Sequence, residues 1–294
     1  MRNELDMAAA HGADADSDLS ALLRGYSAEV TAHDRKGLEA AVALMRPGAE
    51  VSIACVPGES TDRLVAAAKL LRQAGLVPVP HLVARNMESR AAFNRLLERL
   101  AGEAGLDRAL LLGGDRDKPS GELDSSLQLI ETGFLRKHGV GRIGLAIYPE
   151  GHPRIADAVL AAALSAKLEA AKNAGLDVWL ISQFCFDAKA ILALARRLRA
   201  QGVRQPFRIG VAGPAKRSTL IKYALTCGVG ASMRALKERQ DLARNVLAGE
   251  TPEALLREVA AAQSAEPALG LSGVHLFTFG SLAKSAAWAD SFAT

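Results

Sequence analysis

The sequence has little that would indicate a disulfide-stabilised fold, a zinc site or a membrane protein. Its three cysteines, Cys55, Cys185 and Cys227, are odd in number and irregularly spaced, which fits neither a disulfide framework nor a paired-cysteine zinc site. No apolar run approaches the ~20 residues that cross a bilayer. Residues 1–18 carry acidic residues and lack the apolar centre of a signal peptide. We therefore expect a cytoplasmic protein that binds no membrane.

Aromatic residues and net charge are also scarce. Phe, Trp and Tyr make up 4% of the chain, so the core must be built mainly from Ala, Leu and Val. The net charge is +4, and the basic residues are scattered, with short runs at Arg196–Arg199 and Arg234–Arg239 on predicted helices. A nucleic-acid-binding protein concentrates its basic residues on one face, so we expect no nucleic-acid partner.

Eight short apolar runs alternate with amphipathic segments rich in Ala and Leu. Such alternation predicts repeated strand–helix units, and eight of them close into a barrel. We therefore predict an α/β fold, an eight-stranded (β/α)8 TIM barrel. Residues 18–294 would form a single catalytic domain after a mobile N-terminal segment, residues 1–17. The expected strands are 28–32, 51–56, 77–83, 108–112, 142–147, 178–182, 207–211 and 274–279.

Local features add further expectations about these elements. Pro78 and Pro80 lie inside the third expected strand, and because proline cannot donate to a ladder we expect this strand to be short or distorted. Helical spacing of apolar residues predicts helices over 125–138 and 153–173. Residues 219–247 are expected to form two helices broken at Gly228–Gly230.

Residues with useful chemistry lie near the ends of the expected strands. In such barrels the active site lies where the strands end, and the residues there are Glu29, Cys55, His81, Asp115, Tyr148, His152, Gln183, Gly213 and Phe277. Partial desolvation of a carboxylate such as Glu29 favours its protonated form and suits it to donate a proton. Two alternatives stay open: an ion pair at the rim for Glu29 and a purely structural hydrogen bond for His81.

Three of the strand ends carry short motifs. The segment YPEGHP, residues 148–153, places an aromatic ring, a carboxylate and an imidazole together, and its prolines fix the backbone. Gly113-Gly114-Asp115 allows a ligand to approach the backbone closely. Gln183 either matches the edge of a heterocycle such as a pterin or tethers its own loop. The sequence shows neither Ser–His–Asp logic nor metal-ligand spacing, so we expect an organic cofactor and no metal.

Taken in order, several segments resemble the methylenetetrahydrofolate reductase family: AEV, VPHL, GGD, YPEGHP, AGLDVWLISQFCFD and GVHLFTF. The resemblance extends from about Ala28 to Trp288, and YPEGHP and the AG…SQF…FD segment are its most specific parts. It implies a barrel that binds FAD, takes NAD(P)H as co-substrate and interconverts 5,10-methylene- and 5-methyltetrahydrofolate.

The resemblance also implies roles for individual residues. Glu29 corresponds to the acid that protonates the folate, and Asp115 to the aspartate beside flavin and pterin. The residues implied to bind the tetrahydrofolate derivative are Asp115, Gln183, Phe184 and Phe277. The residues implied to bind the cofactor are His81, Gly113, Gly114, Asp115, Tyr148, His152 and Lys172.

Some positions depart from the family pattern. Gly113 stands where the family has an arginine, Glu169 and Ala171 stand where it has lysines, Ala54 replaces a hydroxyl residue and Ser281 an arginine. A diphosphate needs positive charge or N–H donors nearby. We therefore expect FAD to bind more weakly than is usual for the family, unless the charge is supplied by Lys118, Lys167 or Lys172.

Two other functions stay open at this point. The chain could oxidise methyltetrahydrofolate in a demethylation pathway, or it could be a flavin-free protein with a folate-binding or regulatory role. The sequence also leaves open the reaction direction, the choice between NADH and NADPH, and whether the chain forms a homo-oligomer.

Overall fold

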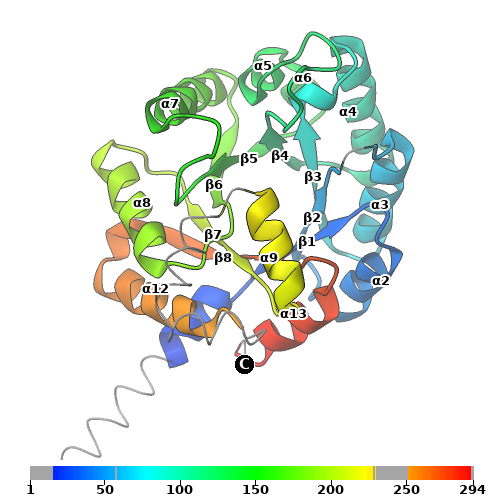
Figure 1. Ribbon diagram of the computed structural model, residues 1–294. Coiled ribbons are helices and arrows are strands. Elements are labelled where there is room, and N and C mark those ends of the chain that lie inside the picture. The colour runs from blue at the N-terminus through cyan, green and yellow to red at the C-terminus, as the bar shows by residue number, and fades with distance from the viewer. Residues whose placement is uncertain (1–15, 57, 228, 230–250, 293–294) are drawn as a thin grey trace, which may run out of the picture. The chain divides into compact units, whose positions relative to one another are not determined.

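The computed structural model describes residues 16–56, 58–227, 229 and 251–292 of the chain. Eight strands follow one another around a closed barrel in the order β1 to β8 (Figure 1), which confirms the predicted TIM-barrel fold. The strands are β1 (Ser27–Thr31), β2 (Glu50–Ala54), β3 (Val77–Val83), β4 (Arg108–Leu112), β5 (Arg142–Ile147), β6 (Asp177–Ser182), β7 (Phe207–Ala212) and β8 (Leu271–Phe277).

The chain divides into two compact units. The first, here the β1–β5 unit, comprises Ser27–Ile147 and Gly151–Ile181. It therefore also contains β6 as far as Ile181. The second, here the β7–β8 unit, comprises Met1–Tyr26, Tyr148–Glu150 and Ser182–Thr294. The single-domain boundary expected from the sequence stays a prediction, and the two units are described separately below.

In the β1–β5 unit, parallel strands alternate with helices that cover their outer side, as α2, α3 and α4 do in Figure 1. Helix α3 illustrates the local causes: the Ser60 hydroxyl caps its first turn by accepting from Arg63 N, and Leu64, Ala68 and Leu71 bury one face. The elements that connect the strands are α2 (Arg35–Leu44), α3 (Thr61–Gln73), η1 (Ala84–Asn86), α4 (Arg90–Ala104), α5 (Ser126–Glu131), α6 (Phe134–Lys137) and α7 (Asp157–Asn173).

Strand β3 is neither short nor distorted, so the expectation from its prolines was wrong. It runs unbroken over Val77–Val83. Val77 N donates to Ala49 O, so the N–H groups of alternate residues face β2, and the nitrogens of Pro78 and Pro80 face the other neighbour. Pairing with that neighbour, β4, begins only at His81. Both prolines therefore lie where no ladder hydrogen bond is required of them.

Two predicted helices of this unit begin or end differently from expectation. The helix expected over 125–138 is divided into α5 and α6 because Gly133, with a φ of +72°, turns the chain between them. The helix expected from Pro153 begins only at Asp157, since His152 and Ile155 first form an isolated bridge. This four-residue turn keeps His152 near the end of β5.

A cluster of apolar side chains supports the sheet of the β1–β5 unit. Val79, Leu110, Trp179 and Ile181 pack together, with Leu112 against them. Gly144 makes room for the indole, because an added Cβ would lie 2.7 Å from Trp179 Cζ2. Side chains two residues apart on a strand share a face, so His81 projects from the same face of β3 as Val79, nearer the strand's C-terminal end.

The β7–β8 unit contains the paired strands β7 and β8. The helices described in it are a short helix over residues 16–23, α8 (Ala188–Ala200), α9 (Arg217–Thr226), α12 (Glu253–Ala265), η2 (Pro267–Leu269) and α13 (Leu282–Asp290). Helix α9 accounts for the first part of the segment expected to be helical over 219–247. The expected break at Gly228–Gly230 and the second helix fall on positions outside the described residues, apart from residue 229. Among the helices that the structure describes, none is long and apolar enough to cross a bilayer.

Candidate functional site

The side chains of Glu29 and His81 lie close together in the β1–β5 unit. The register pairs Glu29 of β1 with Ser52 of β2, and Ser52 with Val79 of β3, so these side chains line up across the face that carries the apolar cluster. Glu29 Oε2 lies 3.6 Å from His81 Nε2, and the two side chains are 20% and 9% exposed. The carboxyl group is thus held in a largely buried polar pair rather than at a solvated rim.

The loop after β4 brings Gly113, Gly114 and Asp115 to the end of that strand. Arg85 holds it: Arg85 N donates to Gly113 O, and the guanidinium donates to Arg116 O at 2.7 Å. Gly114 has a φ of +106°, and an added Cβ there would lie 2.6 Å from Val83 Cγ1. Gly113 is different, because a Cβ added there would meet nothing within 4 Å. The loop is therefore fixed at Gly114 and leaves open space beside Gly113.

His152 lies next to an arginine that the sequence analysis did not single out. Arg154 N donates to His152 Nδ1 at 3.2 Å, so the imidazole carries its proton on Nε2 when neutral. Burial lowers the pKa of His152, and the positive charge of Arg154 lowers it further, against an opposing effect of Asp115. Near neutral pH His152 is therefore a neutral imidazole with a donor at Nε2.

Arg154 also ties the loop after β5 to the loop after β4. Its guanidinium donates to Asp115 O at 3.0 Å and to Asp117 Oδ1 at 2.9 Å. Only its place directly after YPEGHP marks it in the sequence, and the contact with residues 115–117 is a long-range one that local spacing does not reveal. Arg154 therefore adds a second cation, after Arg85, beside the Gly113–Asp115 loop.

Three lysines are candidates to replace the cationic residues that the family places near the flavin diphosphate, and they occupy different positions. Lys118 is exposed in the loop after β4. Lys167 is half-buried in α7, where burial lowers the pKa of its ammonium group. Lys172 is exposed in the last turn of α7, the end that leads into the start of β6. The role of Lys172 at the cofactor stays a prediction, and none of the contacts described above includes it.

In the β7–β8 unit, the predicted substrate residues belong to an aromatic cluster. Phe184 is 1% exposed, and its ring centroid lies 5.4 Å from that of Phe277 and 5.3 Å from that of Phe279, both in edge-on geometry. Phe279, whose φ of +48° is uncommon for a residue other than glycine, stacks on Tyr223 at 4.5 Å. Phe277 is only half-buried, so it is the more accessible of the two predicted rings.

Gln183 follows β6 beside this aromatic cluster. Its Oε1 accepts from Phe184 N at 3.0 Å, which is the loop-tethering role left open by the sequence. No other described residue is hydrogen-bonded to its Nε2 group, so the two N–H donors of that group are left for a ligand. The tethering and ligand-binding roles are therefore compatible for this side chain.

Tyr148 and Glu150, the first part of YPEGHP, also belong to the β7–β8 unit, and both are half-buried. Glu150 Oε1 lies 3.6 Å from the Sγ of Cys185, a buried thiol. Burial raises the pKa of Cys185 far above its ordinary value, and the negative charge of Glu150 adds to this effect. Cys185 is therefore a protonated structural thiol and not a nucleophile.

Within residues 16–56, 58–227, 229 and 251–292, no group of three or more His, Cys, Asp and Glu side chains is arranged to hold a metal ion. The candidate residues described above instead provide a carboxyl–imidazole pair, amide and backbone hydrogen-bond donors, and aromatic rings.

A solved structure with a similar course of the chain is the dihydropteroate synthase (FolP) of Thermus thermophilus. It is 17% identical, the similarity covers 90% of this chain and 92% of that chain, and the TM-score is 0.48. A likeness this distant carries no inference about function.

The family model for methylenetetrahydrofolate reductase matches residues 42–245. The matched range includes the loops after β4 and β5 and the Gln183 segment, whereas Glu29 and Phe277 lie outside it. Well over half of the 294 residues are matched, so the chain belongs to the methylenetetrahydrofolate reductase family, which indicates an oxidoreductase acting on a folate.

Proposed function

We propose that this protein interconverts 5,10-methylenetetrahydrofolate and 5-methyltetrahydrofolate, with FAD as cofactor and NAD(P)H as the outside partner. The observation that carries the proposal is the Glu29–His81 pair, with 3.6 Å between Oε2 and Nε2 in a largely buried setting. A carboxyl group shielded from water is suited to hold a proton and release it to a bound substrate. The match to the methylenetetrahydrofolate reductase family supports a folate as the substrate.

The proposed role of Glu29 is to donate a proton to the folate as its methylene bridge opens. Protonation makes the bridging nitrogen a better leaving group and leaves a reactive iminium on the folate. In the oxidative direction the same carboxylate takes the proton back. A positioned general acid of this kind contributes about 100-fold or more to a rate.

The pterin ring requires partners that both donate and accept. We propose that Asp115 accepts from the pterin N–H groups and that the free Nε2 of Gln183 donates to it. Phe277 offers a half-exposed ring for contact with the folate, and Phe184 supports Phe277 from the buried side. Losing the hydrogen bond from half-buried Gln183 costs about 1–3 kcal/mol, whereas the bond to exposed Asp115 contributes less.

The residues of the β1–β5 unit fit a flavin nucleotide in two respects. Open space beside Gly113 admits a ligand close to the backbone. Arg154 supplies a positive charge beside the same loop, although Asp117 already shares it. FAD, when bound, supplies the hydride chemistry. We expect it to bind measurably but more weakly than in a site with several unshared cations.

Product analysis tests this function. The purified protein, supplied with FAD, NADH or NADPH and 5,10-methylenetetrahydrofolate, is expected to form 5-methyltetrahydrofolate, detected by mass spectrometry. The reverse reaction is tested with 5-methyltetrahydrofolate and a dye as electron acceptor. Folate binding without turnover in either direction, with or without FAD, would contradict the proposal and favour a folate-binding protein.

A further inference from the structure

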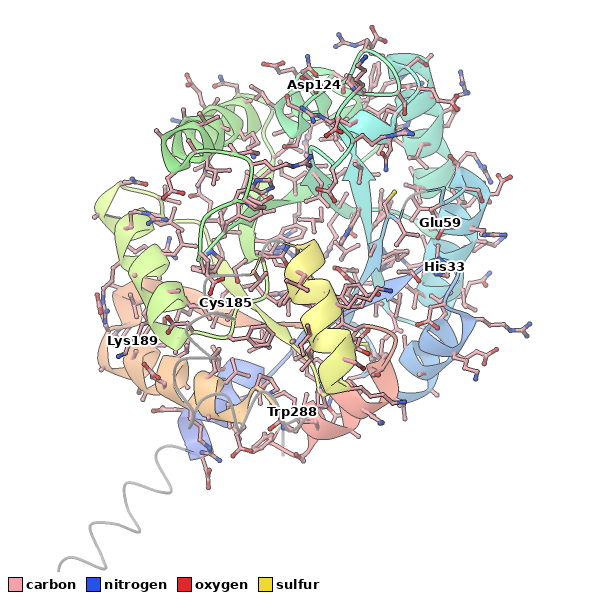
Figure 2. The ribbon with its side chains drawn as sticks, in the orientation of Figure 1. His33, Glu59, Asp124, Cys185, Lys189 and Trp288 are labelled. Carbon is pink, nitrogen blue, oxygen red and sulfur yellow. The ribbon has the colours of Figure 1, made fainter. Side chains whose placement is uncertain are left out.

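A second polar cluster lies at the ends of β1, β2 and β3, within the β1–β5 unit. His33 Nδ1 lies 3.0 Å from Glu59 Oε2, and the two side chains are 52% and 2% exposed (Figure 2). Glu59 immediately precedes Ser60, the N-cap of α3, and His33 follows β1. Neither residue has a role in the function proposed above.

One oxygen of this buried carboxylate has no partner. Glu59 Oε2 accepts from the imidazole, whereas Oε1 is buried and makes no hydrogen bond to any residue that the structure describes. A buried acceptor without a donor is costly, and native proteins rarely leave one unsatisfied. The atom therefore calls for an N–H or O–H donor from outside the described chain.

The neighbouring groups indicate what kind of donor fits. Asn86 Nδ2 donates to Cys55 Sγ at 3.4 Å through one of its two N–H groups, and no described residue takes the other. Burial raises the pKa of the Cys55 thiol, and the negative charge of Glu59 adds to this, against the hydrogen bond from Asn86. Cys55 is therefore a neutral thiol, and the cluster offers an acceptor on Glu59 and a donor on Asn86.

A hydroxyl group donates and accepts at the same point, as a water molecule at the site also does. An ammonium ion could satisfy Glu59 but could accept nothing from Asn86. Adjacent hydroxyls of a ribose satisfy both, and in Rossmann folds, a different architecture, a carboxylate beyond a strand end accepts from a ribose hydroxyl of NAD in the same way. His33, Cys55 and Asn86 are at least partly exposed, so the cluster borders the solvent from which a ligand arrives.

We propose that Glu59, braced by His33, binds a ribose-type hydroxyl of a dinucleotide, and that the nicotinamide dinucleotide it selects is NADH. The inference rests on the proposed function only in requiring a nicotinamide partner. In NADPH a phosphate replaces one ribose hydroxyl, which removes the donor and places negative charge against the Glu59 carboxylate. A hydroxyl of the flavin's own sugar chain has the same chemistry, and the experiment separates the two sources.

The test is a set of binding titrations on the full-length protein, following ligand fluorescence for NADH, NADPH and FAD. We expect NADH to bind at least about tenfold more tightly than NADPH, as the loss of one charge-assisted hydrogen bond implies. Glu59→Gln keeps the shape of the side chain but removes its charge. This variant is expected to weaken the binding of NADH about tenfold and to remove most of the preference for NADH over NADPH, with the affinity for FAD unchanged.

Controls separate this result from damage to the fold and from failure of the proposed function. Glu39→Gln, which alters an exposed pair with Arg35 on α2, is the matched control and should change nothing. His33→Gln removes only the imidazole that contacts Glu59 and should weaken the binding of NADH less than Glu59→Gln does. Oxidation of methyltetrahydrofolate with a dye acceptor needs no nicotinamide, so it should survive in Glu59→Gln.

Each outcome decides the proposal. Weaker FAD binding with unchanged NADH binding would retain the hydroxyl site but assign it to the flavin and overturn the selection of NADH. Unchanged affinities for all three ligands in a folded Glu59→Gln protein would overturn the proposal altogether. Absence of dye-linked activity in the wild type would instead count against the proposed function while the titrations remained interpretable.

Discussion

The two units of the molecule present candidate residues of opposite character. In the β1–β5 unit they are ionisable and joined by polar contacts, as in the Glu29–His81 pair and the Arg154 bridge to Asp115 O. In the β7–β8 unit they are mostly rings, with Phe184, Phe277 and Phe279 in mutual contact. Proton transfer and charge binding need the first kind of surface, whereas a flat conjugated ring needs the second. The following predictions test whether the two surfaces have these separate tasks.

The largest effect is expected from Glu29→Gln, which keeps the size of the side chain and removes the acid. Folate turnover should fall by at least the ~100-fold typical of a general acid. Reduction of bound FAD by nicotinamide should be unchanged, because that step needs no proton from Glu29. Steady-state turnover and nicotinamide half-reaction rates measure the two steps separately, and near-normal folate turnover would remove Glu29 from the role.

Gln183→Ala probes the ring-binding surface and should have the next largest effect. Losing the Nε2 donor to a buried pterin costs about 1–3 kcal/mol, or roughly 5- to 150-fold in folate affinity. Calorimetric titration with methyltetrahydrofolate measures it. The expected pattern is weaker folate binding with FAD affinity retained; equal losses for both ligands would show that the side chain acts through the fold of its loop.

Two glycines of one loop provide a matched pair. Gly114→Ala places a Cβ where Val83 already lies and strains a φ of +106°, so it should lower stability by about 1–3 kcal/mol in thermal unfolding. Gly113→Ala meets nothing within 4 Å and should leave the unfolding temperature unchanged. If the open space beside Gly113 receives the flavin, this second variant should nevertheless bind FAD more weakly. Unchanged FAD affinity in Gly113→Ala would place the cofactor elsewhere.

The smallest expected effect concerns the charge around His152. Burial and Arg154 both lower the pKa of this imidazole, so its neutral form persists below the ordinary value of about 6.5. The unfolded chain binds the proton first, and His152 therefore reduces stability as the pH falls through that ordinary value. Arg154→Gln should raise the pKa of His152, measured by NMR titration of the imidazole. An unchanged titration would show that burial alone sets it.

The strands were predictable because apolar runs and their spacing are local. Three of the predicted strands, 77–83, 108–112 and 142–147, coincide with β3, β4 and β5, and the order of the units confirmed the barrel. The proline effect in β3 was not predictable, since it depends on which neighbour the proline nitrogens face. That information lies in the register between strands and not in the strand itself.

The candidate site was predictable as a set of positions but not as a set of contacts. The sequence placed Glu29 and His81 in the first and third strands, although both lie inside β1 and β3 and not at their ends, and their pairing required the stagger of β1 against β2 and β3. Arg154 and Glu59 escaped notice because a loop-to-loop hydrogen bond and the burial of a carboxylate are both long-range properties. Local motifs therefore identified the family better than they identified the charges around the ligand.

The most direct test of the account is anaerobic mixing of the protein carrying reduced FAD with 5,10-methylenetetrahydrofolate while flavin absorbance is followed, because in this direction the bridge must open before the flavin can be oxidised. The account predicts that the wild type regains the absorbance of oxidised flavin on mixing, and that Glu29→Gln does so at least ~100-fold more slowly although it binds the folate. A wild-type protein that binds both FAD and methylenetetrahydrofolate and keeps its flavin reduced would contradict the account.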